Sequence, residues 1–93
     1  VVGVLFVEMH IPGATNLKAK RRVLQSIKAN VRNRFNVSIS EVDFHDLWQR
    51  SALGVAGVGP DHVPVEREMN EIFRMIDENP ELEVTSHNIE FYR

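Results

Sequence analysis

Apolar and β-branched residues fill the first eleven positions of the chain, VVGVLFVEMHI. Both alternating sets of positions are apolar through the first seven residues, which is typical of a central strand covered on both faces. The even-numbered set comprises Val2, Val4 and Phe6. Glu8 and His10 then interrupt this set, and Pro12-Gly13 ends the predicted strand.

A helical period follows between Asn16 and Phe35. Apolar residues recur there with the spacing of one helix face, and they are Leu17, Leu24, Ile27, Val31 and Phe35. Asn16 is the expected N-cap, with Thr15 as the alternative, and Asn36 is expected to end the helix in a left-handed conformation. Lys20 departs from the pattern, because it falls in the middle of the apolar arc.

Two further strands are predicted over residues 36–44 and 49–58, joined by the short turn FHDLW. The first of them changes its apolar parity after Ile39, which predicts a β-bulge near Ser40-Glu41. The second has small residues on one face, namely Ala52, Gly54 and Ala56. Small residues in a strand indicate that another group approaches that face closely.

The last third of the chain predicts one helix and one strand. Gly59-Pro60 breaks the strand pattern, and Asp61 is expected to cap a helix that extends to about Asn79. Its outer face is acidic and mixed. The final strand, from Leu82 to Tyr92, is less regular and is expected at a sheet edge.

The element order is therefore βαββαβ. Short connections, right-handed crossovers and a central hairpin predict one α+β domain over residues 1–93, a ferredoxin-like βαββαβ sandwich. The antiparallel sheet would have the strand order 4-1-3-2, with both helices on one face. The opposite face would be open, and it would expose the even-numbered side chains of the first strand.

Composition fits an ordinary globular domain and excludes some chemistries. The chain has 93 residues, of which 43% are hydrophobic and 26% charged. It contains no cysteine, which excludes disulfides, thiolate nucleophiles and cysteine-based zinc sites. No apolar run approaches the roughly 18 residues of a membrane span. The first strand begins at Val1, which leaves no room for a signal peptide, so we expect a cytoplasmic protein with no membrane partner.

The positive charge is concentrated in the first helix. The segment from Asn16 to Phe35 holds seven of the eleven basic residues and no acid, although the whole chain has a net charge of −2. Basic side chains at a helix N-terminus oppose the helix dipole, and together with free backbone N–H groups they can bind phosphate. The candidate site for RNA or another anion comprises Lys18, Lys20, Arg21, Arg22, His45 and Trp48. In it, Trp48 or His45 would stack on a base.

Alternatives remain open at this corner. The basic residues could be neutralised within the fold by the acidic second helix, or by Asp43, Asp46 and Glu78, which the topology brings to the same rim. Lys20 is better explained as a partly buried lysine paired with an acid than as a catalytic amine. Trp48 would more often cover the hairpin as a core residue than form a stacking platform.

The sequence predicts no enzyme, no catalytic residue, no metal site and no cofactor. Its serines lack a nucleophile context, and its four histidines lack the spacing of a helical metal motif. His10 and His45 could approach each other on the rim, so a metal or small-ligand site there is a further alternative. A second hypothesis is a protein interaction module, in which the open sheet face forms a homodimer.

Two long segments, GVLFVEMHIPGATNLKAKRRVL and RNRFNVSISEVDFHDLWQRSALGVA, resemble the YlxP-like family of small bacterial proteins. The resemblance covers nearly the whole chain. It implies a ferredoxin-like fold and a bacterial cytoplasmic protein with no established biochemical activity. Genes of this family often lie beside genes for translation initiation and ribosome maturation, so the resemblance implies a role near the ribosome. It supplies no catalytic residues.

Overall fold

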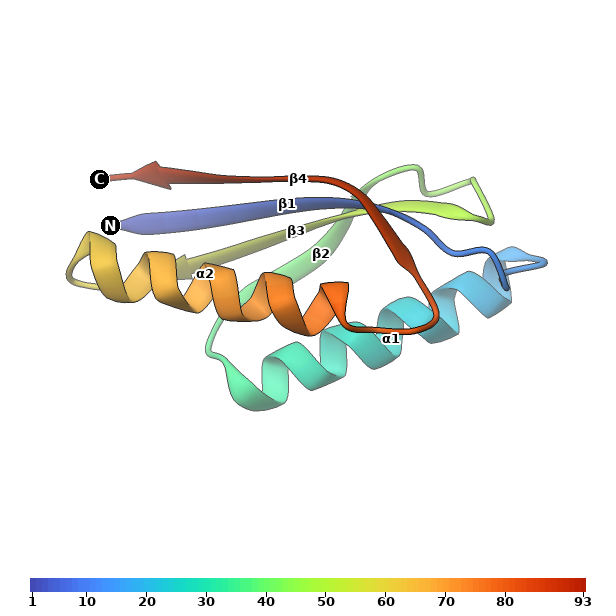
Figure 1. Cartoon of the computed structure of the whole chain (residues 1–93), viewed down its shortest axis with the longest axis horizontal. Coiled ribbons are helices and arrows are strands. Elements are labelled where there is room, and N and C mark those ends of the chain that lie inside the picture. The colour runs from blue at the N-terminus through green and yellow to red at the C-terminus, as the bar shows by residue number, and fades with distance from the viewer.

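The computed structural model describes residues 1–93 and has the predicted order of elements. They are β1 (Val2–His10), α1 (Leu17–Arg34), β2 (Ser38–Asp43), β3 (Arg50–Val58), α2 (His62–Asp77) and β4 (Glu83–Tyr92). Figure 1 shows the four strands as one layer and the two helices as a second layer on the same side of it. All six elements were predicted, with ends that differ by a few residues at most.

The sheet has the order β2-β3-β1-β4, which is the predicted order read from the other edge. All three pairs of neighbouring strands are antiparallel. β1 and β3 are the central strands, which explains why both faces of β1 are apolar in sequence. The α+β ferredoxin-like fold is thereby confirmed.

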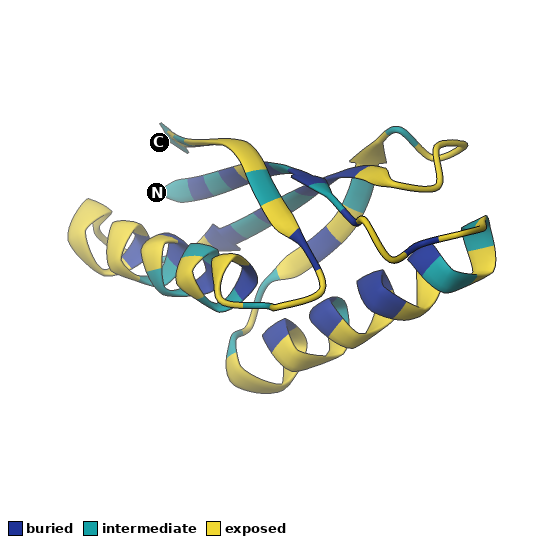
Figure 2. Cartoon of the chain, turned by 45° about the vertical axis from the view of Figure 1, so that its right-hand side comes forward, coloured by how far each residue is buried: buried dark blue, intermediate teal, exposed yellow.

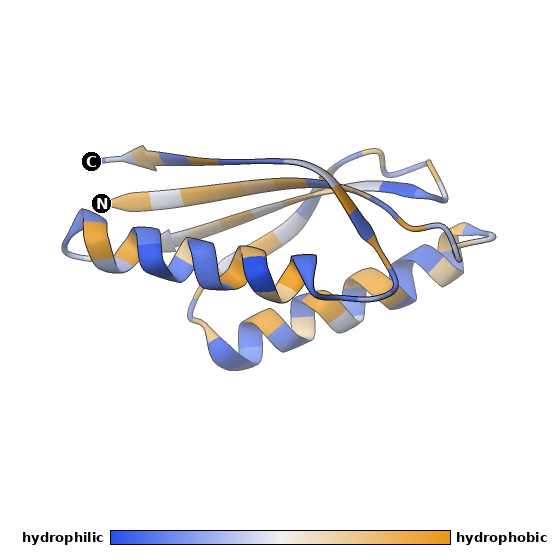
Figure 3. Ribbon diagram, viewed as in Figure 1, coloured by the Kyte–Doolittle hydropathy of each residue, from blue (hydrophilic) through white to orange (hydrophobic).

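The core lies between the sheet and the helices. In β1 it contains Leu5, Val7 and Met9, each fully buried, and in α2 it contains Met69 and Ile72. Figure 2 shows that the buried segments of both helices face the sheet, and Figure 3 shows the matching alternation of hydrophobic and hydrophilic residues along each helix. Helical amphipathicity therefore fixes which side of the sheet is covered.

The two ends of α1 were predicted with different success. Asn16 is the N-cap, since its side-chain oxygen accepts a hydrogen bond from the Ala19 N–H at 2.8 Å. The expected left-handed stop at Asn36 is wrong, because the only non-glycine residue with positive φ is Phe44. The helix ends instead at Phe35, whose extended backbone leads the chain directly toward β2.

A β-bulge lies in β2, slightly beyond its predicted position. The pairing with β3 shifts between Glu41 and Asp43, so Val42 is the extra residue. The side chain of Val42 lies on the face of the sheet away from the helices, because a Cβ built on Gly54 would be only 2.9 Å from it. The bulge therefore lets Glu41 point toward α1 while Val42 points to the other side.

Candidate nucleic-acid interface

The start of α1 presents three basic side chains to solvent. Lys18, Arg21 and Arg22 are exposed, and we call them the basic cluster. The first turn of the helix contains no acidic residue. Each exposed cation at this end opposes the helix dipole by about 0.3–1 kcal/mol. Local helix stability therefore does not explain the placement of the basic cluster.

No acidic residue neutralises the basic cluster through a direct ion pair. The four ion pairs in the structure are His10–Glu83, Lys20–Glu41, Arg50–Glu8 and His62–Glu66. None of them joins α1 to α2, and none involves Asp43, Asp46 or Glu78. The positive charge of the basic cluster is thus left facing solvent.

Lys20 does not belong to a solvent-facing site, and its assignment to the anion-binding set is corrected by the structure. Its side chain is 1% exposed, and its Nζ lies 3.0 Å from a carboxylate oxygen of Glu41. The same ammonium donates to three backbone carbonyl oxygens, those of Phe44 at 2.8 Å, His45 at 3.3 Å and Arg50 at 3.3 Å. Ser51 donates a further hydrogen bond to Glu41 at 2.7 Å. The alternative interpretation, a buried lysine paired with an acid, is confirmed.

The base of the β2–β3 loop has an unusual backbone, which the sequence did not reveal. Phe44 has φ 62°, a left-handed conformation that costs a residue with a side chain about 1–2 kcal/mol. Its carbonyl is the closest backbone acceptor of Lys20, and its ring lies 3.9 Å beneath the guanidinium of Arg50. These two contacts hold the loop in a conformation that phenylalanine rarely adopts.

The β2–β3 loop carries an exposed apolar tip. Leu47 is 47% exposed and Trp48 is 54% exposed, so Trp48 is not the core residue that we had favoured. An open hollow of about 530 Å³ lies here, lined by His10, Asp46, Leu47, Trp48, Gln49 and Arg50. His45 is also exposed, and its Nε2 lies 3.1 Å from the carbonyl oxygen of Glu41.

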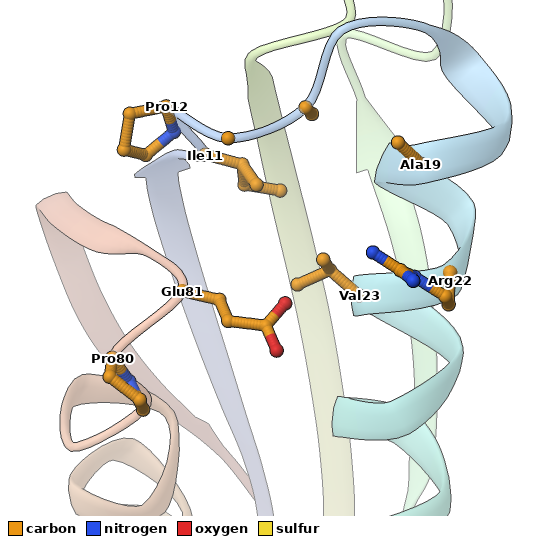
Figure 4. Close-up of a pocket in the computed structure, with 9 residues that line it drawn as sticks. Ile11, Pro12, Ala19, Arg22, Val23, Pro80 and Glu81 are labelled. Atoms are coloured by element: carbon orange, nitrogen blue, oxygen red, sulfur yellow. The ribbon is translucent and has the colours of Figure 1, made fainter.

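A second pocket, of about 270 Å³, separates the basic cluster from this tip. It is lined by residues 11–14, Ala19, Arg22, Val23, Pro80 and Glu81. Figure 4 shows the Glu81 carboxylate pointing across the pocket toward α1, where Arg22 and Val23 lie. The two hollows share no lining residue, although Gln49 links them by donating to the carbonyls of Pro12 and Ala14. The predicted rim is therefore two neighbouring surfaces.

The histidines of the rim are engaged separately. His10 lies 3.7 Å from Glu83, whereas His45 contacts the backbone of Glu41. No three histidine, aspartate or glutamate side chains lie close enough together to hold a metal ion. Neither helix is long and apolar enough to cross a membrane.

The face of the sheet away from the helices, here the helix-free face, carries large apolar side chains in contact with solvent. They include Phe6, 39% exposed, Val58, 76% exposed, and Tyr92, 53% exposed. On the same face the Tyr92 hydroxyl donates to Glu90. This hydrogen bond lowers the pKa of Glu90, with a smaller contribution from Asn88, and raises the pKa of Tyr92.

Comparison with known proteins agrees with the fold and with the earlier resemblance. Residues 2–89 match the family described as "Protein of unknown function (DUF503)". The chain is also 40% identical over 92 residues to the "Uncharacterized protein YlxP" of Bacillus subtilis (strain 168). That alignment covers 99% of this chain and 100% of the Bacillus protein. The chain therefore belongs to the DUF503 family, which includes this YlxP relative.

Proposed function

We propose that this protein is a non-enzymatic accessory factor that contacts RNA, free or within a ribonucleoprotein, through the basic cluster at the start of α1. The observation that supports this most is the absence of any ion pair at Lys18, Arg21 and Arg22. Unpaired cations that oppose a helix dipole reduce stability unless an anion binds them. Phosphate groups fit this environment, because backbone N–H groups at the same helix end add further donors.

The adjoining β2–β3 loop supports RNA as the source of the phosphate. Trp48 offers an exposed aromatic surface, and base–aromatic stacking contributes about 1–3 kcal/mol per base. Gln49 fixes this loop to the segment that precedes α1. A single strand that runs along the basic cluster could thus place a base on Trp48. A folded domain with an overall charge of −2 would bind RNA only at this local surface.

A charge-neutralising triple variant tests the proposal. Lys18→Gln, Arg21→Gln and Arg22→Gln, combined in one protein, should weaken binding to a labelled single-stranded RNA. They should also reduce the slope of log K against log[salt] by about 2, since each phosphate contact contributes about 0.7 on a single strand. Trp48→Ala should weaken binding with little change in that slope, because stacking releases no counterion.

The matched control changes the same amount of charge elsewhere. Arg67, Arg74 and Arg93 are exposed and form no ion pair, so their combined replacement by Gln also removes three positive charges. This control should retain most of the affinity and the original salt slope. If both triple variants lose affinity equally, binding depends on net charge alone and the proposed site is wrong. An unchanged slope in the first variant has the same consequence.

A further inference from the structure

The helix-free face has an apolar centre with polar edges. Its two central strands carry most of the apolar side chains, and both outer strands carry polar ones. The polar residues of β2 on this face are Ser38, Ser40 and Asp43, and those of β4 are Ser86, Asn88 and Glu90. An apolar centre inside a polar rim is the usual anatomy of a protein–protein interface.

The sizes of the central side chains differ between the two strands in a regular way. On β1 the residues of this face are Val2, Val4 and Phe6, and their direct partners on β3 are Val58, Ala56 and Gly54. Side chains therefore become larger along β1 as they become smaller along β3. At the level of Phe6 the neighbouring β3 position has no side chain at all. The face thus contains a ridge and a matching trough, side by side.

We propose that a second copy of this chain covers the helix-free face, related by a two-fold axis that runs parallel to the strands between β1 and β3. This axis lays the ridge of one copy into the trough of the other, at the same level along the strands. Phe6 then faces the partner's Gly54, and Val4 faces the partner's Ala56. Two sheets packed in this way lie about 10 Å apart, a distance that interdigitating side chains fill.

The same arrangement keeps acidic side chains apart. The axis lays β4 of one copy over β2 of the other, so Glu90 faces the partner's Ser38. Glu8 faces the small Ala52 of the partner subunit. A two-fold axis perpendicular to the strands through the centre of the face would instead lay Phe6 on Phe6 and Gly54 on Gly54. That arrangement leaves an empty space at the glycines, so the side-chain sizes favour the parallel axis.

The available area fits a weak or moderate dimer. Four strands spaced about 4.8 Å apart, with nine residues rising about 3.3 Å each, give a flat area of roughly 570 Å² per copy. The pair would thus bury about 1,100 Å², more where side chains interdigitate, which is close to the lower limit of stable interfaces. Dissociation should therefore be measurable by sedimentation equilibrium as the concentration rises from nanomolar to high micromolar.

Single substitutions test whether this face forms the dimer. Phe6→Ala should raise the dimer dissociation constant by at least about 30-fold, because a central aromatic anchor is removed twice. Val63→Glu is the matched control, since Val63 is 58% exposed but lies on α2, and its dissociation constant should match that of the unmodified chain. An unmodified chain that stays monomeric throughout overturns the proposal, as does equal weakening by both variants.

Mixing two variants tests the direction of the axis. Val4→Lys and Ala56→Glu should each weaken self-association, because a charge is buried against an apolar residue of the partner. An equimolar mixture should form heterodimers at least tenfold more tightly than either variant associates with itself, since the new lysine then faces the new glutamate. Circular dichroism confirms that both variants fold. A mixture no tighter than the separate variants overturns the proposed axis.

Discussion

The buried ion pair between Lys20 and Glu41 gives the sharpest test of how the β2–β3 loop is held. Glu41→Gln keeps the shape of the side chain and its contact with Ser51, but removes the only carboxylate near a buried ammonium. Lys20 is 1% exposed and the side chain of Glu41 is 14% exposed, so water cannot easily replace the lost charge. Three backbone carbonyls would remain as the only acceptors of Lys20.

The expected loss is a large part of the total stability. Removing one partner of a buried ion pair costs about 3–5 kcal/mol. A domain of this length has a free energy of unfolding of about 5–14 kcal/mol. A loss of 3 kcal/mol would lower the melting temperature by about 12–24 °C. Lys20→Met should cost at least as much, because it leaves those carbonyls without their donor.

Urea unfolding followed by far-UV circular dichroism measures these losses. Trp48 fluorescence is a poor reporter of global unfolding, because this residue is 54% exposed in the folded state. In the double variant Lys20→Met, Glu41→Gln, the loss should be smaller than the sum of the single losses by about 1–3 kcal/mol. Glu66→Gln is the control, since its pair with His62 is half exposed, and its loss should be within about 0.5 kcal/mol. If Glu41→Gln is as mild as this control, the buried pair does not hold the loop.

Two further predictions follow from packing and from the pKa shifts. Gly3→Ala should destabilise the fold by about 1–3 kcal/mol, because its Cβ would lie 2.5 Å from Val65, whereas Gly13→Ala, with nothing within 4 Å, should cost much less in the same urea experiment. Tyr92→Phe should raise the pKa of Glu90 toward its ordinary value, since the phenol is the main cause of the lowered pKa, and carboxyl NMR titration would detect the change. The lowered pKa means that this contribution to stability is present above the ordinary pKa of glutamate and is lost as the pH falls. An unchanged titration of Glu90 in the variant would contradict the assigned cause.

The fold could be predicted because its signals are local. A strand with both faces apolar, two helices with one apolar stripe and short connections leave few topologies, and the observed strand order is one of them. The burial of Lys20 could also be predicted, because a helix places every residue at a known angle from its neighbours. Its partner Glu41 could not be named, since that required the position of the bulge at Val42.

The details of the β2–β3 loop could not be predicted from its residues. A phenylalanine gives no signal for positive φ, and the conformation of Phe44 depends on the contacts of its carbonyl and ring with Lys20 and Arg50. Trp48 lies in a stretch without periodicity, so its burial could not be deduced. The division of the rim into two hollows likewise depends on the hydrogen bonds of Gln49, which join segments distant in sequence.

The two proposed surfaces lie on different layers of the molecule and can be occupied together. The basic cluster is on α1, which covers one side of the sheet, and the proposed dimer uses the other side (Figure 1). A two-fold axis between the packed sheets directs the two α1 helices outward, on opposite sides of the assembly. The dimer would therefore present two separate basic clusters rather than one continuous groove. Such an assembly favours the joining of two RNA segments over the clamping of one, and its avidity depends on how far apart those segments lie.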